Sequence, residues 1–486
     1  MIRPIKNWKS VLGIILLGLF ILLLPHLISF FNGNYNLLDD KSYFNLNVAN
    51  QISNQEIDKN FFILEDENAY HGRQILLNPY QVFLYLFNSE IFSRLIPIFL
   101  GLISLFLIYL VLRRLNISDQ IRTLTMAMVL LSPIFIYTFS FSNKYSLAIT
   151  LMLLGFYFFL KESWYTLILS CFCFLIVPLF GNFESTLSIL LLLGYVLITK
   201  QKKNRFIFVL LYLIIMMVIF NFVFLSNLQQ SIQPNFLTFN FFKDIISDFG
   251  SEVGLGLFKF LLGIIGLAFI WNQRNENKYL VSIFAIIIFS VIFYDKSNLI
   301  YANLLLSYLA AIGLDFFINR KWHVEILKYL TLITIFSGLL FSSVSYIMVV
   351  TRNNYTVEQS ESLLWLNENQ EKGIIFSYKD YGFFINYYSE MPVLMDSYYE
   401  HNLEINNFYR MSENLFNSTS LRHSVEMLEQ LNIDYIWITQ EMKEGLVWDN
   451  EIGLLFLLRN RDHFEKIYEN EEVQIYRITQ NINKTN

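Results

Sequence analysis

The chain has 486 residues, of which 55% are hydrophobic and 15% charged, and its formal net charge is −5. Because soluble domains carry about a quarter of charged residues, this composition excludes an ordinary water-soluble protein. The sequence has no basic surface interleaved with aromatic residues and no Gly-rich phosphate-binding motif, which argues against nucleic-acid and nucleotide binding.

Apolar blocks long enough to cross a bilayer recur along the chain, and each crossing needs about 20 residues. The first block follows basic residues and has no cleavage site after it, so we expect a retained first span. The pattern predicts about eleven transmembrane helices. They fall near 11–31, 92–112, 121–140, 145–160, 163–181, 185–199, 206–226, 254–271, 279–294, 299–318 and 327–350.

Lysine and arginine residues gather in every second connection between these blocks, beginning with the segment before the first one. Such residues favour the cytoplasmic side of a membrane. Acidic residues outnumber basic ones in 31–90 and in 352–486. We therefore predict a multi-pass protein of the cell membrane with a cytoplasmic N-terminus and a C-terminal domain outside.

The last part of the chain has the pattern of a small α/β domain. Amphipathic helices are predicted at 357–369 and 421–431, apolar strands at 373–378 and 434–439, and a closing hairpin at 464–478. The predicted fold class is a polytopic α-helical membrane protein with a C-terminal soluble α/β domain. The predicted domains are a membrane domain at 1–350, including an outer loop at 31–90, and an exported domain at 351–486.

Two adjacent acids, Asp39 and Asp40, follow the first span. The stretch after them is predicted to lie along the membrane interface as an amphipathic helix, with Tyr43, Phe44 and Leu46 toward lipid. Two carboxylates there could bind a divalent cation, with Asp40 as the ligand, or one could act as a base toward an acceptor hydroxyl. The alternative is an ordinary acidic loop.

Further polar candidates lie at the predicted outer ends of spans. His71 and Arg73 precede the second span, and the planar guanidinium of Arg73 could pair with a phosphate or face solvent. Glu184 lies between the fifth and sixth spans, where burial of a carboxylate is costly and often functional. Lys243 and Glu252 belong to the longest outer connection in the second half of the chain.

Several of these segments resemble the C-type glycosyltransferase superfamily, integral membrane enzymes that use polyprenyl-phosphate-linked sugars. LLDDKSYFNLNVANQI resembles the acidic motif of the first outer loop, and RLIPIFLGLISLFLIYLVLRR resembles the second span. LLSPIFIYTFSFSNKYSLAITLMLLGFYFFL resembles the third and fourth spans. In the tail, SYKDYGFFINYYSEMPVLMD and NIDYIWIT resemble archaeal members related to the oligosaccharyltransferase catalytic subunit.

The chain departs from this family in two places. The hairpin between spans three and four usually carries an acid, whereas this chain has Asn143 and Lys144, so a second metal carboxylate is not supplied there. The tail keeps Asp380 and Tyr381 of the Trp-Trp-Asp-Tyr-Gly motif, but tyrosine and lysine replace the two tryptophans. Recognition of an Asn-x-Ser/Thr peptide is therefore not implied.

The resemblance implies transfer of a sugar from a polyprenyl-phosphate-linked donor to a glycan, lipid or protein acceptor on the non-cytoplasmic face. It implies inversion at the anomeric carbon, Asp39 or Asp40 as the base, and Mg²⁺ or Mn²⁺ as the cofactor to be tested. The substrate-binding candidates are Tyr43, His71, Arg73, Glu184, Lys243, Glu252, Asp380 and Tyr381. The open alternatives are an oligosaccharyltransferase that glycosylates asparagine, a transporter, and a relative without catalysis.

Overall fold

A computed structural model shows the chain as two compact units. It describes residues 8–54, 63–66, 69–70, 72–87, 89–161, 163–199, 205, 207–209, 211–212, 214–216, 246–249, 253–272, 298–352, 354–397 and 403–479. The helical unit comprises Met1–Ile28, Arg94–Leu228 and Pro234–Arg352. The mixed unit comprises Ser29–Ser93, Gln229–Gln233 and Asn353–Asn486. The first outer loop thus groups with the C-terminal tail, whereas the sequence assigned it to the membrane domain.

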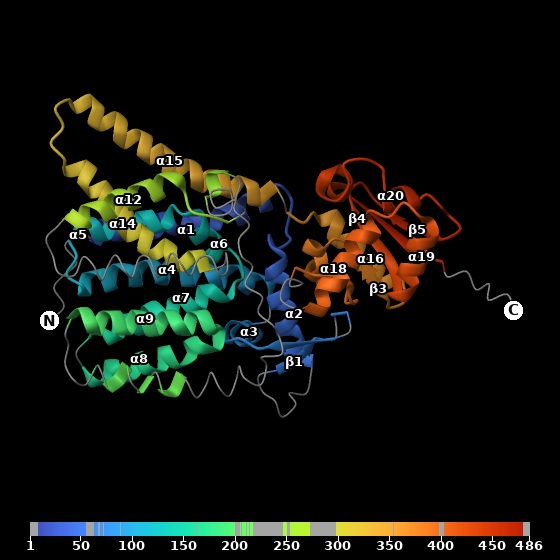
Figure 1. Cartoon of the computed structure of the whole chain (residues 1–486), viewed down its shortest axis with the longest axis horizontal. Helices are drawn as coiled ribbons and strands as arrows, with labels where there is room; N and C mark the ends of the chain where they lie inside the picture. Colours follow the sequence, from blue (N-terminus) through green and yellow to red (C-terminus); the bar gives the residue numbers. More distant parts are fainter. Residues whose placement is uncertain are drawn as a thin grey trace. The chain divides into compact units, whose positions relative to one another are not determined.

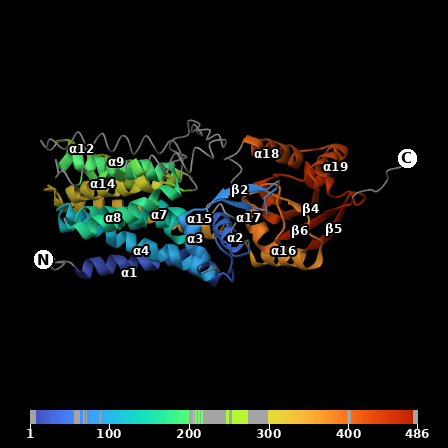
Figure 2. The ribbon, with the colours of Figure 1, turned by 90° about the horizontal axis from the view of Figure 1, so that it is seen from below.

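The helical unit is built from long apolar helices, most of which run alongside one another (Figures 1 and 2). In chain order they are α1 (Trp8–Phe31), α4 (Glu90–Arg114), α5 (Asp119–Leu130), α6 (Pro133–Ser140), α7 (Lys144–Phe159), α8 (Trp164–Ile176), α9 (Asn182–Thr199), α12 (Leu257–Asn272), α14 (Leu299–Asn319) and α15 (Glu325–Arg352). Short 3₁₀ turns lie at η1 (Val177–Phe180) and η3 (Ser247–Phe249).

Some of these helices can cross a membrane on length and composition alone. Among the described residues, α1, α4, α14 and the helix beginning at Glu325 meet that test, and α5 with α6 makes a fifth if the pair is one broken span. The predicted spans at 206–226 and 279–294 fall largely or wholly outside the described residues. The total of about eleven spans therefore stays a prediction.

The predicted span at 121–140 is two helices, α5 and α6, that meet at an angle of 69°. Pro133 is the first residue of α6, and Ser132 before it has an extended backbone with φ −107° and ψ 128°. Proline has no N–H to continue the preceding helix, and it disfavours the helical conformation in the residue before it. The break therefore follows from the Ser-Pro pair in the sequence.

Helices α12 and α14 approach each other through glycine. A side chain at Gly266 would overlap the carbonyl of Leu309, and one at Gly313 would overlap the carbonyl of Leu262. Small residues allow helix backbones to touch in membrane proteins, where packing rather than water exclusion drives association. These glycines thus set the spacing of this helix pair.

The mixed unit combines the outer loop with the tail. The loop contributes α2 (Asp40–Asn54), β1 (Ile63–Asp66), β2 (Arg73–Leu76) and α3 (Pro79–Tyr85). The tail contributes α16 (Val357–Asn369), β3 (Ile374–Phe376), η5 (Lys379–Tyr381), α17 (Gly382–Ser389), α18 (Leu403–Phe416), α19 (Leu421–Gln430), β4 (Ile433–Thr439), η7 (Met442–Leu446), α20 (Leu454–Leu457), β5 (Phe464–Glu469) and β6 (Val473–Ile478).

The tail forms a four-stranded sheet in the order β3-β4-β6-β5. Strand β3 runs parallel to β4, and the other pairs are antiparallel, with Ile436 opposite Tyr476. Helix α16 begins where a capping box predicts it, because the Thr356 hydroxyl accepts from the Gln359 amide and the Gln359 side chain accepts from the Thr356 amide.

The apolar face of α2 is buried inside the mixed unit. Tyr43 is fully buried and Phe44 is nearly so. Their rings lie 5.3 Å from Phe384 and 4.7 Å from Phe383, between centroids. The expectation that Tyr43, Phe44 and Leu46 face lipid was therefore wrong. Their partner is α17, a helix from the tail that the sequence reading did not predict.

Candidate functional site

Asp40 begins α2 and is buried, with 5% of its surface exposed. One carboxylate oxygen accepts from the Phe384 amide at 3.0 Å, and the other accepts from the Ser397 hydroxyl at 2.8 Å. Burial raises the pKa of Asp40 well above its usual range, the two hydrogen bonds oppose that rise, and the charges of Asp39 and Asp396 add to it.

These contacts bear on the expected metal-binding role of Asp40. Each oxygen of Asp40 already accepts one hydrogen bond, and the side chain is almost fully buried. Among the described residues, no group of three or more His, Cys, Asp or Glu side chains could hold a metal ion. The described residues around Asp40 therefore do not fit a metal site, and we derive no step through one.

Asp39 has a different setting from Asp40. It is half-buried and immediately precedes α2, and its carbonyl accepts from the Ser42 amide at 3.1 Å. A carboxylate at a helix N-terminus is stabilised by the helix dipole. Of the two predicted acids, Asp39 is the more accessible, so the hypothesis of a base rests on it.

Several candidates cannot be placed. His71, Lys243 and Glu252 lie outside the described residues. Arg73 is described in its backbone, which pairs with Asp66 across the β1–β2 hairpin. The binding roles predicted for these four residues stay predictions.

Two tyrosines expected near a substrate are core residues of the mixed unit. Tyr43 accepts from the Leu37 amide at 2.9 Å. Tyr381 is buried, its hydroxyl donates to Glu441 at 2.7 Å, and burial raises its pKa well above the usual range. The neighbouring Asp380 has an exposed side chain. Of the Asp-Tyr pair, the acid is thus the member that a ligand could reach.

Gly382, which completes the Asp-Tyr-Gly sequence, has a packing role. A Cβ atom there would lie 2.6 Å from the Asp396 Cα atom and 2.6 Å from the Met395 carbonyl oxygen. Such distances are far inside van der Waals contact. The backbone at Met395 and Asp396 can therefore approach residue 382 only because it has no side chain.

Glu184 lies in the first turn of α9 and is 3% exposed. Its carboxylate accepts from the Tyr301 hydroxyl at 3.3 Å. Asn143 and Lys144 lie at the start of α7. The Lys144 ammonium donates to the Phe180 carbonyl at 3.3 Å, and the Asn143 side chain caps α7 by accepting from the Tyr145 amide. The two positions that depart from the family pattern thus hold the ends of α7 and η1.

Sequence reasoning missed a buried lysine in the helical unit. Lys259 on α12 is 1% exposed and donates to the side-chain oxygen of Asn303 on α14. The Ser132 hydroxyl, at the α5–α6 break, donates to the same oxygen at 2.8 Å. Among the described residues, the Asn303 amide nitrogen has no partner. We call these three residues the Lys259 cluster, and a lysine inside a predicted apolar span was the signal that could have found it.

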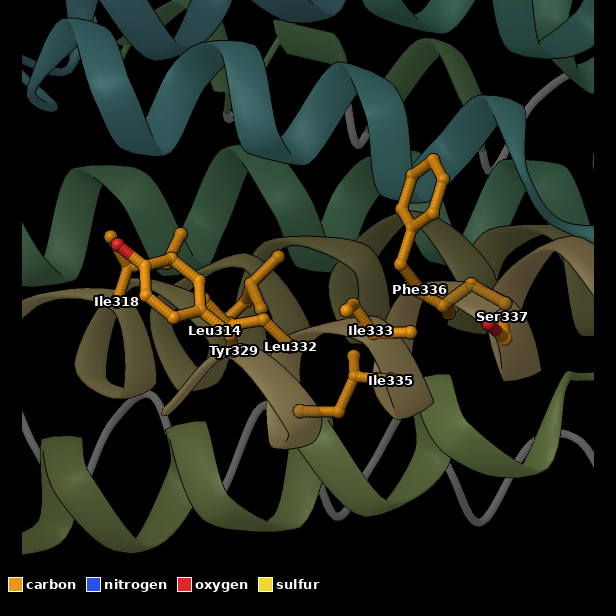
Figure 3. A pocket seen from close by; sticks show the side chains of 9 residues that line it. Leu314, Ile318, Tyr329, Leu332, Ile333, Ile335, Phe336 and Ser337 are labelled. Carbon is orange, nitrogen blue, oxygen red and sulfur yellow. The ribbon is translucent and has the colours of Figure 1, made fainter. Parts of the chain in front are cut away.

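A cavity of about 370 Å³ lies between α14 and α15. Figure 3 shows that aliphatic and aromatic side chains line it, among them Leu314, Ile318, Ile333 and Phe336. A lining of this kind can accommodate hydrocarbon, and its only polar side chains are the hydroxyl groups of Tyr329 and Ser337. We therefore place no chemistry in it.

No family model and no curated protein matches the sequence. The structure does match solved ones. The apo oligosaccharyltransferase of Archaeoglobus fulgidus has a TM-score of 0.62 at 12% identity, over 98% of this chain and 75% of that one. This protein has the fold of the C-type glycosyltransferases.

Two other C-type glycosyltransferases extend this result. The mycobacterial arabinofuranosyltransferase AftD has a TM-score of 0.59 at 12% identity, over 97% of this chain and 42% of that one. ArnT from Cupriavidus metallidurans, bound to undecaprenyl phosphate, has a TM-score of 0.50 at 14% identity, over 97% of this chain and 98% of that one. At these identities the likeness shows the fold alone, and it confirms the resemblance drawn from the sequence.

Proposed function

We propose that the protein is an integral membrane glycosyltransferase that moves a hexosyl or pentosyl group from a polyprenyl-phosphate-linked donor to an acceptor on the non-cytoplasmic face. The observation that carries this proposal is the fold match over 97% or more of the chain. One matching enzyme was solved with undecaprenyl phosphate and another with a dolichol-phosphate and an inhibitory peptide. The outward orientation rests on the distribution of basic residues.

In the proposed reaction, Asp39 takes the proton from an acceptor hydroxyl. The acceptor oxygen then bonds to the anomeric carbon as that carbon's bond to the phosphate oxygen breaks, and the carrier lipid leaves with its phosphate. The departing phosphate is anionic, so cations stabilise it. Arg73 and Lys243 are the cations proposed from the sequence, and we add the buried Lys259 amine of the helical unit as a proposed hydrogen-bond donor to the phosphate. His71, Glu184, Glu252 and Asp380 remain proposed contacts for the sugar or acceptor.

The test is replacement of Asp39 by asparagine. Loss of a general base costs about two to four orders of magnitude in rate. Asp39→Asn should still fold, because a partly exposed carboxylate contributes little to stability. Sugar transfer from a polyprenyl-phosphate donor would be measured in membranes. The matched control is Asp462→Asn, an exposed acid of the same unit, which should keep wild-type activity. Wild-type transfer by Asp39→Asn would remove Asp39 from the mechanism.

A second candidate is an oligosaccharyltransferase that glycosylates asparagine. The Archaeoglobus oligosaccharyltransferase match supports it. The surviving Asp380-Tyr381-Gly382 sequence also supports it, whereas Tyr378 and Lys379 oppose it because they stand where the family pattern has tryptophans. Incubation with a lipid-linked oligosaccharide and an Asn-x-Ser/Thr peptide distinguishes the two functions. A glycopeptide product would favour the oligosaccharyltransferase. Transfer to a non-peptide acceptor without any glycopeptide would favour the first proposal.

A further inference from the structure

We infer that Asp40 is a positioning residue, which places Asp39 by fastening the start of α2 to α17 and to Ser397. The C-terminal tail would then set the position of the first-loop acid. The inference rests on the proposed role of Asp39 as the base, and it adds a residue whose effect passes through Asp39 rather than through the substrate.

The first argument is that Asp40 caps a distant helix. Phe384 is the third residue of α17, and amides in the first turn of a helix have no acceptor within the helix. The residue at the helix N-cap, Tyr381, supplies no side-chain cap. Asp40 accepts from the Phe384 amide across a sequence separation of 344 residues, so the acid of one segment completes a helix of the other.

The second argument is that the hydrogen bonds of Asp40 are reinforced along α2. The Tyr43 ring lies 5.2 Å from Tyr387, centroid to centroid, and one turn further the Asn47 side chain donates to the Phe383 carbonyl at 3.1 Å. Contacts at three successive places along α2 hold its first two turns against α17. Helix α2 thus has a fixed position within the mixed unit.

The third argument concerns the residue just before α2. The Asp39 carbonyl accepts from the Ser42 amide, so the backbone of Asp39 is tied to the first turn of α2. If Asp40 loses its partners, the first turn of α2 is freed, and Asp39 moves with it. A displacement of about 1 Å at a reacting group can cost about a hundredfold in rate.

The experiment compares Asp40→Ala, Asp40→Asn and Ser397→Ala in the full-length protein. Alanine removes both acceptors, whereas asparagine keeps an oxygen for the Phe384 amide and can still pair with the Ser397 hydroxyl. We expect Asp40→Ala to lower kcat about 10- to 100-fold with KM for donor and acceptor within about threefold. Asp40→Asn should restore kcat to within about threefold of wild type, and Ser397→Ala should fall between them.

The matched control is Ser424→Ala, which deletes another buried hydroxyl of the mixed unit, one that donates to Ser418. It should leave kcat per folded molecule at the wild-type value. Hydrogen exchange over residues 40–54 supplies a second readout, and Asp40→Ala should speed it about tenfold while Ser424→Ala does not.

Three results would overturn the inference. Wild-type kcat in Asp40→Ala would show that Asp39 needs no such support. An equal loss in Asp40→Asn and Asp40→Ala would give Asp40 a chemical role. An equal loss in Ser424→Ala would reduce the effect to general destabilisation. If the wild type transfers no sugar, the proposed function fails, and hydrogen exchange in α2 alone tests the inference. A wild-type exchange rate in Asp40→Ala then overturns it, and a faster exchange rate supports the attachment of α2 to α17.

Discussion

The mixed unit and the helical unit each bury an ionisable residue, and the hydrogen-bond partners of the two residues differ. Asp40 is 5% exposed and Lys259 is 1% exposed. Both oxygens of Asp40 accept from protein donors. Lys259 instead shares one neutral amide oxygen with Ser132. A buried acid whose two oxygens both accept hydrogen bonds has a structural role, whereas we propose an anion-binding role for a buried group of donors that has too few acceptors.

The largest effect that would break this comparison is expected at Lys259. We expect Lys259→Met to lower kcat/KM for the donor about 10- to 100-fold, because it removes an amine that we propose donates to the phosphate. The melting temperature should stay the same or rise, since methionine replaces a buried amine with an apolar side chain of similar size. Donor titrations and thermal unfolding in detergent would measure both. Exposed Lys321→Met is the control, and unchanged donor kinetics in Lys259→Met would make Lys259 part of the framework too.

In the mixed unit, substitutions around Asp40 and α17 should change the stability of the protein and not its binding of the donor. Gly382→Ala should lower the free energy of unfolding by about 1–3 kcal/mol, because its Cβ meets the backbone of Asp396. Gly13→Ala on α1 is the control, since nothing lies within 4 Å of a Cβ there. Denaturation of both variants in detergent would measure the difference, and equal stability would mean that the segment before Asp396 shifts easily to accept the added methyl group.

A smaller effect is expected at Tyr381. Tyr381→Phe removes the hydroxyl that donates to Glu441 and should cost about 0.5–1.5 kcal/mol of stability. KM for the acceptor should stay within about twofold of wild type, because the ring remains buried. A tenfold rise in that KM would return Tyr381 to the substrate site that the sequence proposed for it.

The smallest effect is a pH dependence from Asp40. Its folded-state pKa is raised by burial, so its contribution to stability is full below the usual carboxyl pKa and is lost as pH rises through the folded value. Asp40→Asn cannot ionise. We therefore expect the melting temperature of the variant to gain on wild type as pH increases from 4 to about 9. A constant difference across that range would contradict the raised pKa.

The sequence predicted those elements whose ends are encoded locally. The predicted helix at 357–369 is α16 itself, because its capping box is local, and the predicted hairpin at 464–478 is β5 and β6. The apolar spacing of α2 was also readable. Its partner was not, because α17 lies more than 300 residues further on, and an apolar face does not say whether lipid or protein will cover it.

The candidate site was less predictable than the fold, for a related reason. The sequence drew attention to Asp39 and Asp40 together, but adjacent side chains point in different directions, and the sequence does not say which one is buried. Lys259 was passed over because it stands in an apolar block that was read as a span. Its neighbours Asn303 and Ser132 come from α14 and from the α5–α6 break, so no local pattern joins them.

The glycine contacts between α12 and α14 have a mechanical consequence. With no side chains between the two backbones at Gly266 and Gly313, sliding one helix along the other would drive a larger residue into the gap. The two helices therefore resist sliding past each other at this contact. Because Lys259 lies on α12 and Asn303 on α14, the same contact helps to fix the distance between these two residues.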